Sequence, residues 1–351
     1  MSLKSNNLSN LFSFFNKNRN PIYHFRDLLK RKISILDIGA RDGLGWPWNS
    51  ISPELIKVIL VEPEVKEFEK LKKKNQNVVP YLLYEKETEL RLNINNSPGT
   101  SSIYKPNKVF LEQFDNFERF EPKQILNFDS RTVDSLFKNN EIWDVDFAKI
   151  DIQGGELSVL KGGENFFTKY LIGLEVEVEF CEMYKDQPLF SEVDKYIREN
   201  LGMELWDIRK TYWKYKQKKY SSPNKGRLIF GDALYFRSLD KIEKWLTELD
   251  EDIAKDKVLS LIYTSIAYGY FDYAENIIRS KITLKFFSEK EVKLFIEYID
   301  RIPKGFYPFK KGNKFLYRIF HALSKSFEPT HKGWAKAESN LGSRKKMFFW
   351  L

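Results

Sequence analysis

Apolar residues gather in short runs along the first two thirds of the chain, and several of these runs end on an acidic residue. β-branched and aliphatic residues fill five runs of strand length, which is typical of buried strands. They lie at residues 33–38, 57–61, 78–84, 145–151 and 171–178. Charged segments with apolar residues at helical spacing stand between some of them, at 64–74 and 156–167. Alternating strands and helices predict an α/β fold with a mainly parallel sheet covered on both faces.

Two more apolar runs, 203–208 and 227–237, predict the last strands of the sheet. The segment that joins them, 209–225, has no helical pattern, so we expect a hairpin that adds an antiparallel edge strand. Aromatic residues are interleaved with Lys and Arg in this region: Trp206, Tyr212, Trp213, Tyr215 and Tyr220. These aromatic side chains either stack on a sugar ring or nucleobase or pack on the sheet, and the sequence leaves both interpretations open.

Beyond residue 240 the apolar residues follow a helical period, and no further strand is predicted. At 351 residues the chain also exceeds the usual size of one domain. We therefore divide it into lead-in helices over 1–32, an α/β domain over 33–238 and a helical C-terminal region over 239–351. The helical region is expected to pack on the α/β domain.

The segment 310–325 predicts a basic amphipathic helix within this C-terminal region. Its apolar residues are Phe315, Leu316, Ile319, Phe320 and Leu323, and the last eight residues add more basic and aromatic side chains. Such a helix could rest on an anionic membrane as a peripheral contact. It could equally pack on the α/β domain or on a second copy in a homo-oligomer, and packing is the interpretation we favour.

The composition indicates the cellular compartment of the protein more clearly than it indicates a binding partner. The single cysteine, Cys181, excludes an internal disulfide, and no run of about 20 apolar residues could cross a bilayer. We expect a cytoplasmic protein, with peripheral membrane contact as an addition. The net charge of +9, from 58 basic and 49 acidic residues, suits polyanions. Because both signs are mixed along most of the chain, the charge fits a solvated surface equally well.

A glycine-rich turn after the first predicted strand indicates a ligand site. Gly39 and Gly43 permit tight turns and a close approach of a ligand to the backbone. Arg41 occupies the second glycine position of the dinucleotide fingerprint, which argues against a nicotinamide cofactor. Asp37 on the strand itself could meet the ammonium group of a bound amino acid. Glu62 ends the second strand, where an acidic residue can accept hydrogen bonds from both ribose hydroxyls. Together they favour a nucleoside-containing ligand.

Over residues 33–238 the chain resembles the FkbM-type family of S-adenosylmethionine-dependent methyltransferases, which have a Rossmann-like fold. The matching pieces are 37–40 with Gly43, 61–63, 132–136 and, most specifically, 149–163. Arg41 and Gly155 depart from the usual pattern of the family, but neither departure removes a carboxylate.

The resemblance implies S-adenosyl-L-methionine as the cofactor and assigns residues to its parts. Asp37 and Gly39, with Ala40 and Gly43, would line the methionine part, and Glu62 the ribose. Ser101 and Ser102 would lie near the adenine or ribose. Asp151 would stand at the carboxyl end of the fourth strand, where ligands of open α/β sheets bind.

Carboxylates near the fourth and fifth strands are the candidates for catalysis, because a hydroxyl acceptor gains from a nearby base as its proton leaves. Glu175, Glu177 and Glu179 share one face of a strand, and Asp151 and Glu156 flank the preceding turn. They could hold sugar hydroxyls, hold a divalent cation, raise one another's pKa or face solvent. We predict Asp151 and Glu177 as catalytic residues, with Lys149 as their electrostatic partner. No metal is predicted, since the carboxylates lack a fixed ligand spacing.

Family members act largely on hydroxyl groups of sugars and natural products, so the resemblance implies O-methylation. We predict a sugar hydroxyl on a polysaccharide or glycan precursor as the acceptor. A nucleic-acid methyltransferase is kept as an alternative by the positive charge and disfavoured by the lack of an Asn-Pro-Pro-Tyr-like motif. A non-catalytic nucleoside-binding module with a helical partner-binding tail is the other alternative. An oxidoreductase would not account for the 149–163 segment.

Overall fold

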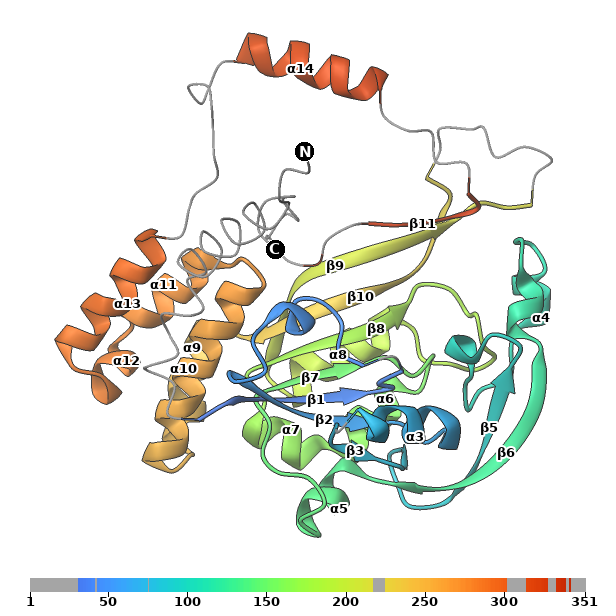
Figure 1. Cartoon of the computed structure of the whole chain (residues 1–351), viewed down its shortest axis with the longest axis horizontal. Coiled ribbons are helices and arrows are strands. Elements are labelled where there is room, and N and C mark those ends of the chain that lie inside the picture. The colour runs from blue at the N-terminus through green and yellow to red at the C-terminus, as the bar shows by residue number, and fades with distance from the viewer. Residues whose placement is uncertain are drawn as a thin grey trace, which may run out of the picture.

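The computed structural model describes residues 31–41, 43–74, 76–216, 225–301, 314–327, 333–338 and 341. Its centre is an eight-stranded sheet in the order β11-β9-β10-β8-β7-β1-β2-β3 (Figure 1). The predicted lead-in helices, apart from residues 31 and 32, lie outside the described residues, as do the 217–224 connection and residues 342–351.

Five strands of this sheet run parallel, as the alternating pattern predicts. They are β1 (Ile33–Ile38), β2 (Ile56–Val61), β3 (Val78–Val79), β7 (Phe147–Ile150) and β8 (Gly173–Glu179). The predicted strand 78–84 is divided, because Pro80 cannot donate a ladder hydrogen bond. Its second half, β4 (Leu82–Leu83), joins a small separate sheet with β6 (Pro122–Arg131) and β5 (Glu89–Asn95).

The predicted hairpin forms and supplies the antiparallel part of the sheet. Its strands are β9 (Met203–Trp213) and β10 (Arg227–Arg237), and β10 pairs antiparallel with both β9 and β8. The later strand of the hairpin therefore lies inside the sheet. The edge beyond β9 is β11 (Ala335–Ala337), also antiparallel to its neighbour. A three-residue strand without an apolar pattern leaves no signal in the sequence.

Four helices between β6 and β9 share an apolar core with one face of the sheet. The described helical segments before β9 are η1 (Trp48–Ser50), α3 (Val65–Lys73), η2 (Pro98–Thr100), α4 (Lys108–Leu111), η3 (Phe117–Phe120), α5 (Val133–Lys138), α6 (Glu156–Gly162), α7 (Glu164–Tyr170) and α8 (Phe190–Asn200). The predicted helix 156–167 is thus two helices that meet at Gly162 and Gly163. A Cβ atom on Gly162 would lie 2.1 Å from the carbonyl oxygen of Tyr84, so this packing requires glycine.

The C-terminal helices cover the opposite face. They are α9 (Leu239–Thr247), α10 (Glu251–Ala267), α11 (Phe271–Arg279), α12 (Lys281–Phe286) and α13 (Glu289–Arg301), and Figure 1 shows them gathered at one side of the sheet. Ile33, Ile35 and Phe147 of the sheet share one apolar cluster with Val258 and Ile262 of α10. The region that begins at residue 239 therefore shares a core with the sheet and even returns β11 to it.

The basic amphipathic segment forms α14 (Lys314–Ser326), one residue past its predicted end. Its described apolar side chains are at least 37% exposed, and the small Ala322 is exposed too, so the predicted packing on the α/β domain does not bury them. Packing on a second copy stays a prediction. Among the described residues, no helix is long and apolar enough to span a membrane.

Candidate functional site

A cleft opens at the carboxyl ends of β1, β2 and β7, the usual ligand position in an open α/β sheet. Six of the predicted cofactor residues line it, together with Lys149 and the loop after β5: Asp37, Gly39, Gly43, Glu62, Ser101 and Asp151. Ala40 and Ser102 are buried beside it. The Ser102 hydroxyl donates a 2.6 Å hydrogen bond to the backbone oxygen of Gln153, so this side chain braces the cleft wall.

The floor of the cleft is the turn at Gly39, and its geometry explains the residue. Gly39 has a φ of +83°, which L side chains rarely adopt. A Cβ atom there would lie 2.0 Å from the carbonyl oxygen of Asp151, and the backbone N–H of Asp151 donates to Ile38 at 3.0 Å. The glycine therefore lets the ends of β1 and β7 close on each other, which brings Asp37 and Asp151 to one cleft.

Asp37 is a buried carboxylate, and one of its oxygens lacks a hydrogen-bond partner among the described residues. Its side chain is 1% exposed, and among the described residues its Oδ1 has no hydrogen-bond partner. Burial raises the pKa of Asp37 to about 6, against the opposing charge of Lys149, its register partner on β7. A buried, unpaired acceptor that lines a cleft indicates a ligand that brings a positive or hydrogen-bonding group.

Glu62 lies on the neighbouring strand end and faces the same cleft. Its Oε1 accepts a 2.8 Å hydrogen bond from the backbone N–H of Glu64, which fixes the carboxylate at the end of β2. Burial raises the pKa of Glu62 as well. Arg41 forms an ion pair with Glu64 at the cleft. The Glu62 carboxylate can thus accept hydrogen bonds from two adjacent hydroxyls of a ligand.

Gln153 links the two predicted catalytic carboxylates, and the sequence analysis missed it. Its Nε2 donates to Asp151 Oδ1 at 3.3 Å and to Glu177 Oε2 at 2.5 Å, while its Oε1 accepts from the Tyr184 hydroxyl at 3.1 Å. Gln153 also holds a φ of +62°, a strained backbone conformation for a residue with a side chain. An amide two residues after Asp151 and directly before Gly154 was the available signal. Lys149 Nζ lies 3.2 Å from Asp151 Oδ2 and lowers the pKa of Asp151 against its burial.

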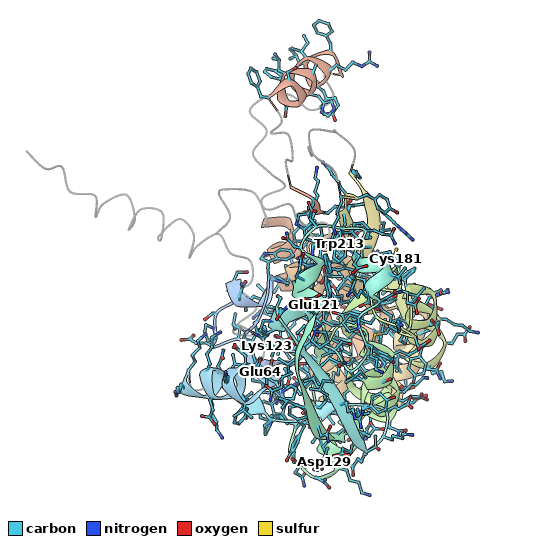
Figure 2. The ribbon with its side chains drawn as sticks, turned by 90° about the vertical axis from the view of Figure 1, so that its right-hand side faces the viewer. Glu64, Glu121, Lys123, Asp129, Cys181 and Trp213 are labelled. Atoms are coloured by element: carbon cyan, nitrogen blue, oxygen red, sulfur yellow. The ribbon has the colours of Figure 1, made fainter. Side chains whose placement is uncertain are left out.

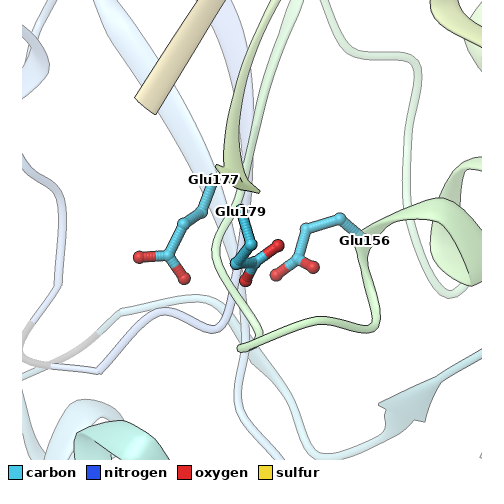
Figure 3. Close-up of side chains that lie close together, drawn as sticks. All are labelled: Glu156, Glu177 and Glu179. Carbon is cyan, nitrogen blue, oxygen red and sulfur yellow. The ribbon is translucent and has the colours of Figure 1, made fainter. Parts of the chain in front are cut away.

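Glu156, Glu177 and Glu179 form a buried carboxylate trio (Figure 3). One oxygen from each lies within 4.8 Å of the others. Burial, with repulsion from Asp151, raises the pKa of Glu156 to about 7. Burial and repulsion from neighbouring carboxylates raise those of Glu177 and Glu179 well above the usual value. Such a set either shares protons or could hold a divalent cation. The interpretation that the strand carboxylates face solvent is wrong, since Glu175, Glu177 and Glu179 are all less than 7% exposed.

One face of the sheet carries a row of charged residues at the cleft end. Paired strand positions point to the same face, and the register pairs Asp37 with Lys149, Lys149 with Glu175, and Glu177 with Asp232. We call this row the charged face: Asp37, Lys149, Asp151, Glu175, Glu177, Arg209 and Asp232. The charged face thus contains five carboxylates and two cations. One of these cations, Arg209, forms an ion pair with Asp232 at 2.8 Å.

The C-terminal helices reach this face. Tyr268, at the end of α10, donates a 2.7 Å hydrogen bond from its hydroxyl to Glu175 Oε2, and both residues are buried. The same tyrosine ring contacts Trp46 and Trp48 of the β1–β2 connection, at centroid distances of 6.1 and 6.0 Å. The helical region therefore supports residues next to the cleft, which its separate position in the sequence does not suggest.

The aromatic patch of the β9–β10 hairpin is mostly packing. The Trp206 ring lies 4.3 Å from that of Tyr273. Trp213, labelled in Figure 2, is 2% exposed, and its ring lies 5.3 Å from that of Phe114. Tyr215 also stacks on Phe114 but is 44% exposed, and Tyr220 lies outside the described residues. The packing interpretation thus holds for Trp206 and Trp213.

A family model built from known proteins matches the part of the chain that forms the cleft. Residues 37–204 match the model of the methyltransferase FkbM domain. No curated protein matches the chain. Among solved structures, methyltransferase FkbM from Methylobacillus flagellatus KT is 16% identical, with 62% of this chain and 50% of that chain covered and a TM-score of 0.34. This chain thus spans half the length of that relative.

In two further similar structures, the match includes a larger share of the other protein's chain. A SAM-dependent methyltransferase from Aquifex aeolicus is 16% identical, over 64% of this chain and 98% of that chain, with a TM-score of 0.28. TrmK of M. capricolum, solved in complex with S-adenosyl-homocysteine, is 11% identical, over 80% of this chain and 97% of that chain, with a TM-score of 0.28.

Proposed function

Because residues 37–204 form a methyltransferase FkbM domain, we propose that the protein transfers the methyl group of S-adenosyl-L-methionine to a hydroxyl of a sugar or glycan. The observation that carries the choice of cofactor is the placement of Asp37 and Glu62 in one cleft. Their separation across adjacent strand ends matches a ligand with an ammonium group at one end and a ribose diol further along. The unpaired Asp37 oxygen takes the ammonium, and Glu62 takes the ribose hydroxyls.

S-adenosylmethionine brings a methyl group that its sulfonium already activates, so the protein needs no covalent intermediate. The residues around Asp151 have to hold an acceptor oxygen in line with that methyl group, and alignment of this kind lowers the barrier by several kcal/mol. Lys149 keeps Asp151 ionised at neutral pH, because it lowers the pKa of that carboxyl. The Asp151 carboxylate can therefore accept a hydrogen bond from the acceptor hydroxyl and orient it.

The hydroxyl proton must leave as the new carbon–oxygen bond forms. Gln153 joins Asp151 to Glu177, and Glu177 belongs to the carboxylate trio with raised pKa values. The raised pKa keeps Glu177 largely protonated, whereas Asp151 is ionised and free to accept a proton. We assign proton removal to Asp151, with Glu177 and Gln153 as the residues that position its carboxylate.

The charge around the cleft supports a polyol acceptor over a nucleic acid. The charged residues that line the cleft are four carboxylates, Asp37, Glu62, Glu64 and Asp151, and two cations, Arg41 and Lys149. A polyphosphate chain would therefore meet more carboxylates than cations there. Carboxylates and an amide are acceptors for the hydroxyls of a sugar. The positive net charge of +9 is a property of the whole chain, and it keeps a nucleic-acid methyltransferase as the second candidate.

We also propose a cytoplasmic setting for this reaction. The proposal rests on cysteine usage, since Cys181 is the one cysteine and is buried without a disulfide. The α/β domain over 33–238 would bind the cofactor, while the helices after residue 239 would complete its core and hold Glu175.

Methyl transfer from labelled S-adenosylmethionine tests the proposal directly. Neutral polysaccharides and nucleotide sugars would be offered beside RNA and DNA, with Glu177→Gln as the site variant and Glu199→Gln, an exposed residue of α8, as its matched control. We expect label in a glycan fraction that Glu177→Gln loses and Glu199→Gln retains. If only the nucleic acid became labelled, the glycan proposal would be replaced by the second candidate, a nucleic-acid methyltransferase.

A further inference from the structure

Helix α14 presents its apolar side chains to solvent. Phe315 is 72% exposed, Leu323 49% and Phe327, directly after the helix, 82%. Figures 1 and 2 both show α14 standing away from the sheet and from α9–α13. Contiguous apolar surface of this kind marks an interaction site in soluble proteins, because monomeric proteins rarely leave large apolar side chains exposed together.

The two sides of this helix differ completely in character. At 100° per residue, Ile319, Leu323 and Phe327 lie on one side, and Leu316 and Phe320 extend the same side. The opposite side carries the basic and titratable residues Lys314, Arg318, His321 and Lys325. Residues 314–327 contain no acidic side chain. The helix is therefore amphipathic with a polar side of one sign.

Charge decides between the surfaces that could cover α14. A helix that pairs with another protein helix usually carries Lys and Glu together beside its apolar seam, because mixed charges set the partner and register. A polar side that is only basic complements a continuous negative surface instead. Anionic phospholipid headgroups provide such a surface next to an apolar layer, and in-plane membrane helices combine these two features.

We propose that α14 binds in the plane of an anionic phospholipid membrane. Ile319, Leu323 and Phe327 enter the boundary between headgroups and acyl chains, while Arg318 remains at the phosphates. Tyr317, 67% exposed and stacked on His321, lies at the border of the two sides, where aromatic rings favour the interface. The helix would hold the rest of the protein at the membrane surface.

Co-sedimentation of the full-length protein with vesicles tests this proposal. Vesicles of phosphatidylcholine alone would be compared with vesicles that also contain phosphatidylglycerol. We expect binding to the anionic vesicles that weakens as salt is added, and weak or no binding to the neutral ones. Leu323→Glu should lower the partition coefficient by roughly tenfold or more, since one leucine burial is about 1.5–3 kcal/mol.

The matched control is Leu284→Glu in α12, because Leu284 is 52% exposed and Leu323 49%. The control should bind vesicles like the unaltered protein. A second pair, Arg318→Glu with Lys325→Glu, should remove the preference for anionic lipid. Equal binding by Leu323→Glu and the unaltered protein would overturn the proposal, and so would a concentration-dependent dimer that Leu323→Glu abolishes without any vesicle binding. Binding of S-adenosylhomocysteine, measured on the same samples, reports the catalytic proposal separately.

Discussion

Lys257 of α10 and Asp146, the residue before β7, form an ion pair in which neither side chain is exposed. Nζ lies 2.8 Å from Asp146 Oδ1 and also donates to the backbone oxygen of Val145 at 2.8 Å. Arg31 adds a second cation to Asp146 at 2.6 Å. The pair lies at the amino end of β7, opposite the cleft. The ion pair therefore links helix α10 to β7, the strand that contains Lys149 and is followed by Asp151.

Removing the lysine should destabilise the whole α/β unit. Lys257→Met leaves Asp146 buried with Arg31 as its one described cation, and breaking a buried pair costs about 3 kcal/mol. The pKa of Asp146 is lowered by Lys257 and Arg31 against burial, so this stabilisation exists above the unfolded pKa and is lost as pH falls through the folded one. Denaturant unfolding at pH 7 and pH 3, with the exposed Lys244→Met as control, measures both effects. Equal stability of the two variants at pH 7 would refute this role.

The affinity for S-adenosylhomocysteine should fall in acid. Asp37 has a pKa of about 6, raised by burial, and it must be ionised to bind the ligand's ammonium group. Affinity is therefore expected to be constant above pH 7 and to fall below pH 6, by up to roughly tenfold per pH unit. Calorimetry between pH 5 and pH 8 gives the profile. Asp37→Asn should bind weakly with a flatter profile, and an unchanged slope in that variant would assign the titration to another group.

Shared protons in the carboxylate trio predict a variant that is more stable than the parent at high pH. The pKa of Glu179 is raised by burial and by Glu156 and Asp151, so its favourable contribution is lost as pH rises through the folded pKa. Glu179→Gln should gain roughly 1–3 kcal/mol at pH 8, the range for an unsatisfied buried group, and little at pH 4. Thermal unfolding in EDTA measures this. If added Mg²⁺ stabilised the parent more than the variant, the trio would hold a cation instead.

Gln153 should matter to turnover more than to cofactor binding. Gln153→Asn keeps an amide that tolerates the left-handed backbone, but it is too short to join Asp151 and Glu177. We expect kcat to fall by up to about 100-fold, the scale for a misplaced catalytic group, and the Kd of S-adenosylhomocysteine to stay within about twofold. Tyr184→Phe removes the other hydrogen bond of this amide and should give a smaller loss. If the affinity for S-adenosylhomocysteine fell as much as kcat, Gln153 would act in cofactor binding only.

The cofactor half of the site could be predicted from the sequence because its signals are local. Asp37 and Gly39 sit at one strand end and Glu62 at the next, and parallel strands bring such ends to one edge. The acceptor half depends on contacts between distant segments. Gln153 meets Tyr184, and Glu175 meets Tyr268 across 93 residues of sequence, which no spacing reveals.

The features that the sequence left undecided have the same physical origin. An aromatic–basic pattern is equally compatible with stacking on a ligand and packing on neighbours, and contacts with Tyr273 and Phe114 decided for packing. The amphipathic pattern of α14 was clear in the sequence, but the surface that it meets was not, because periodicity says which side is apolar and not what covers it.

The central claim is that the cleft between β1 and β2 binds S-adenosylmethionine. Calorimetric titration of the protein with S-adenosylmethionine and S-adenosylhomocysteine tests it most directly, with NADH as the competing nucleotide and Glu62→Ala beside the exposed Glu69→Ala as matched variants. We predict micromolar binding of both methionine nucleosides and none of NADH. Glu62→Ala should weaken binding by roughly 10- to 100-fold, the scale of hydrogen bonds to a charged group, while Glu69→Ala should not. Absence of binding in a folded protein, or equal binding by both variants, would contradict the account.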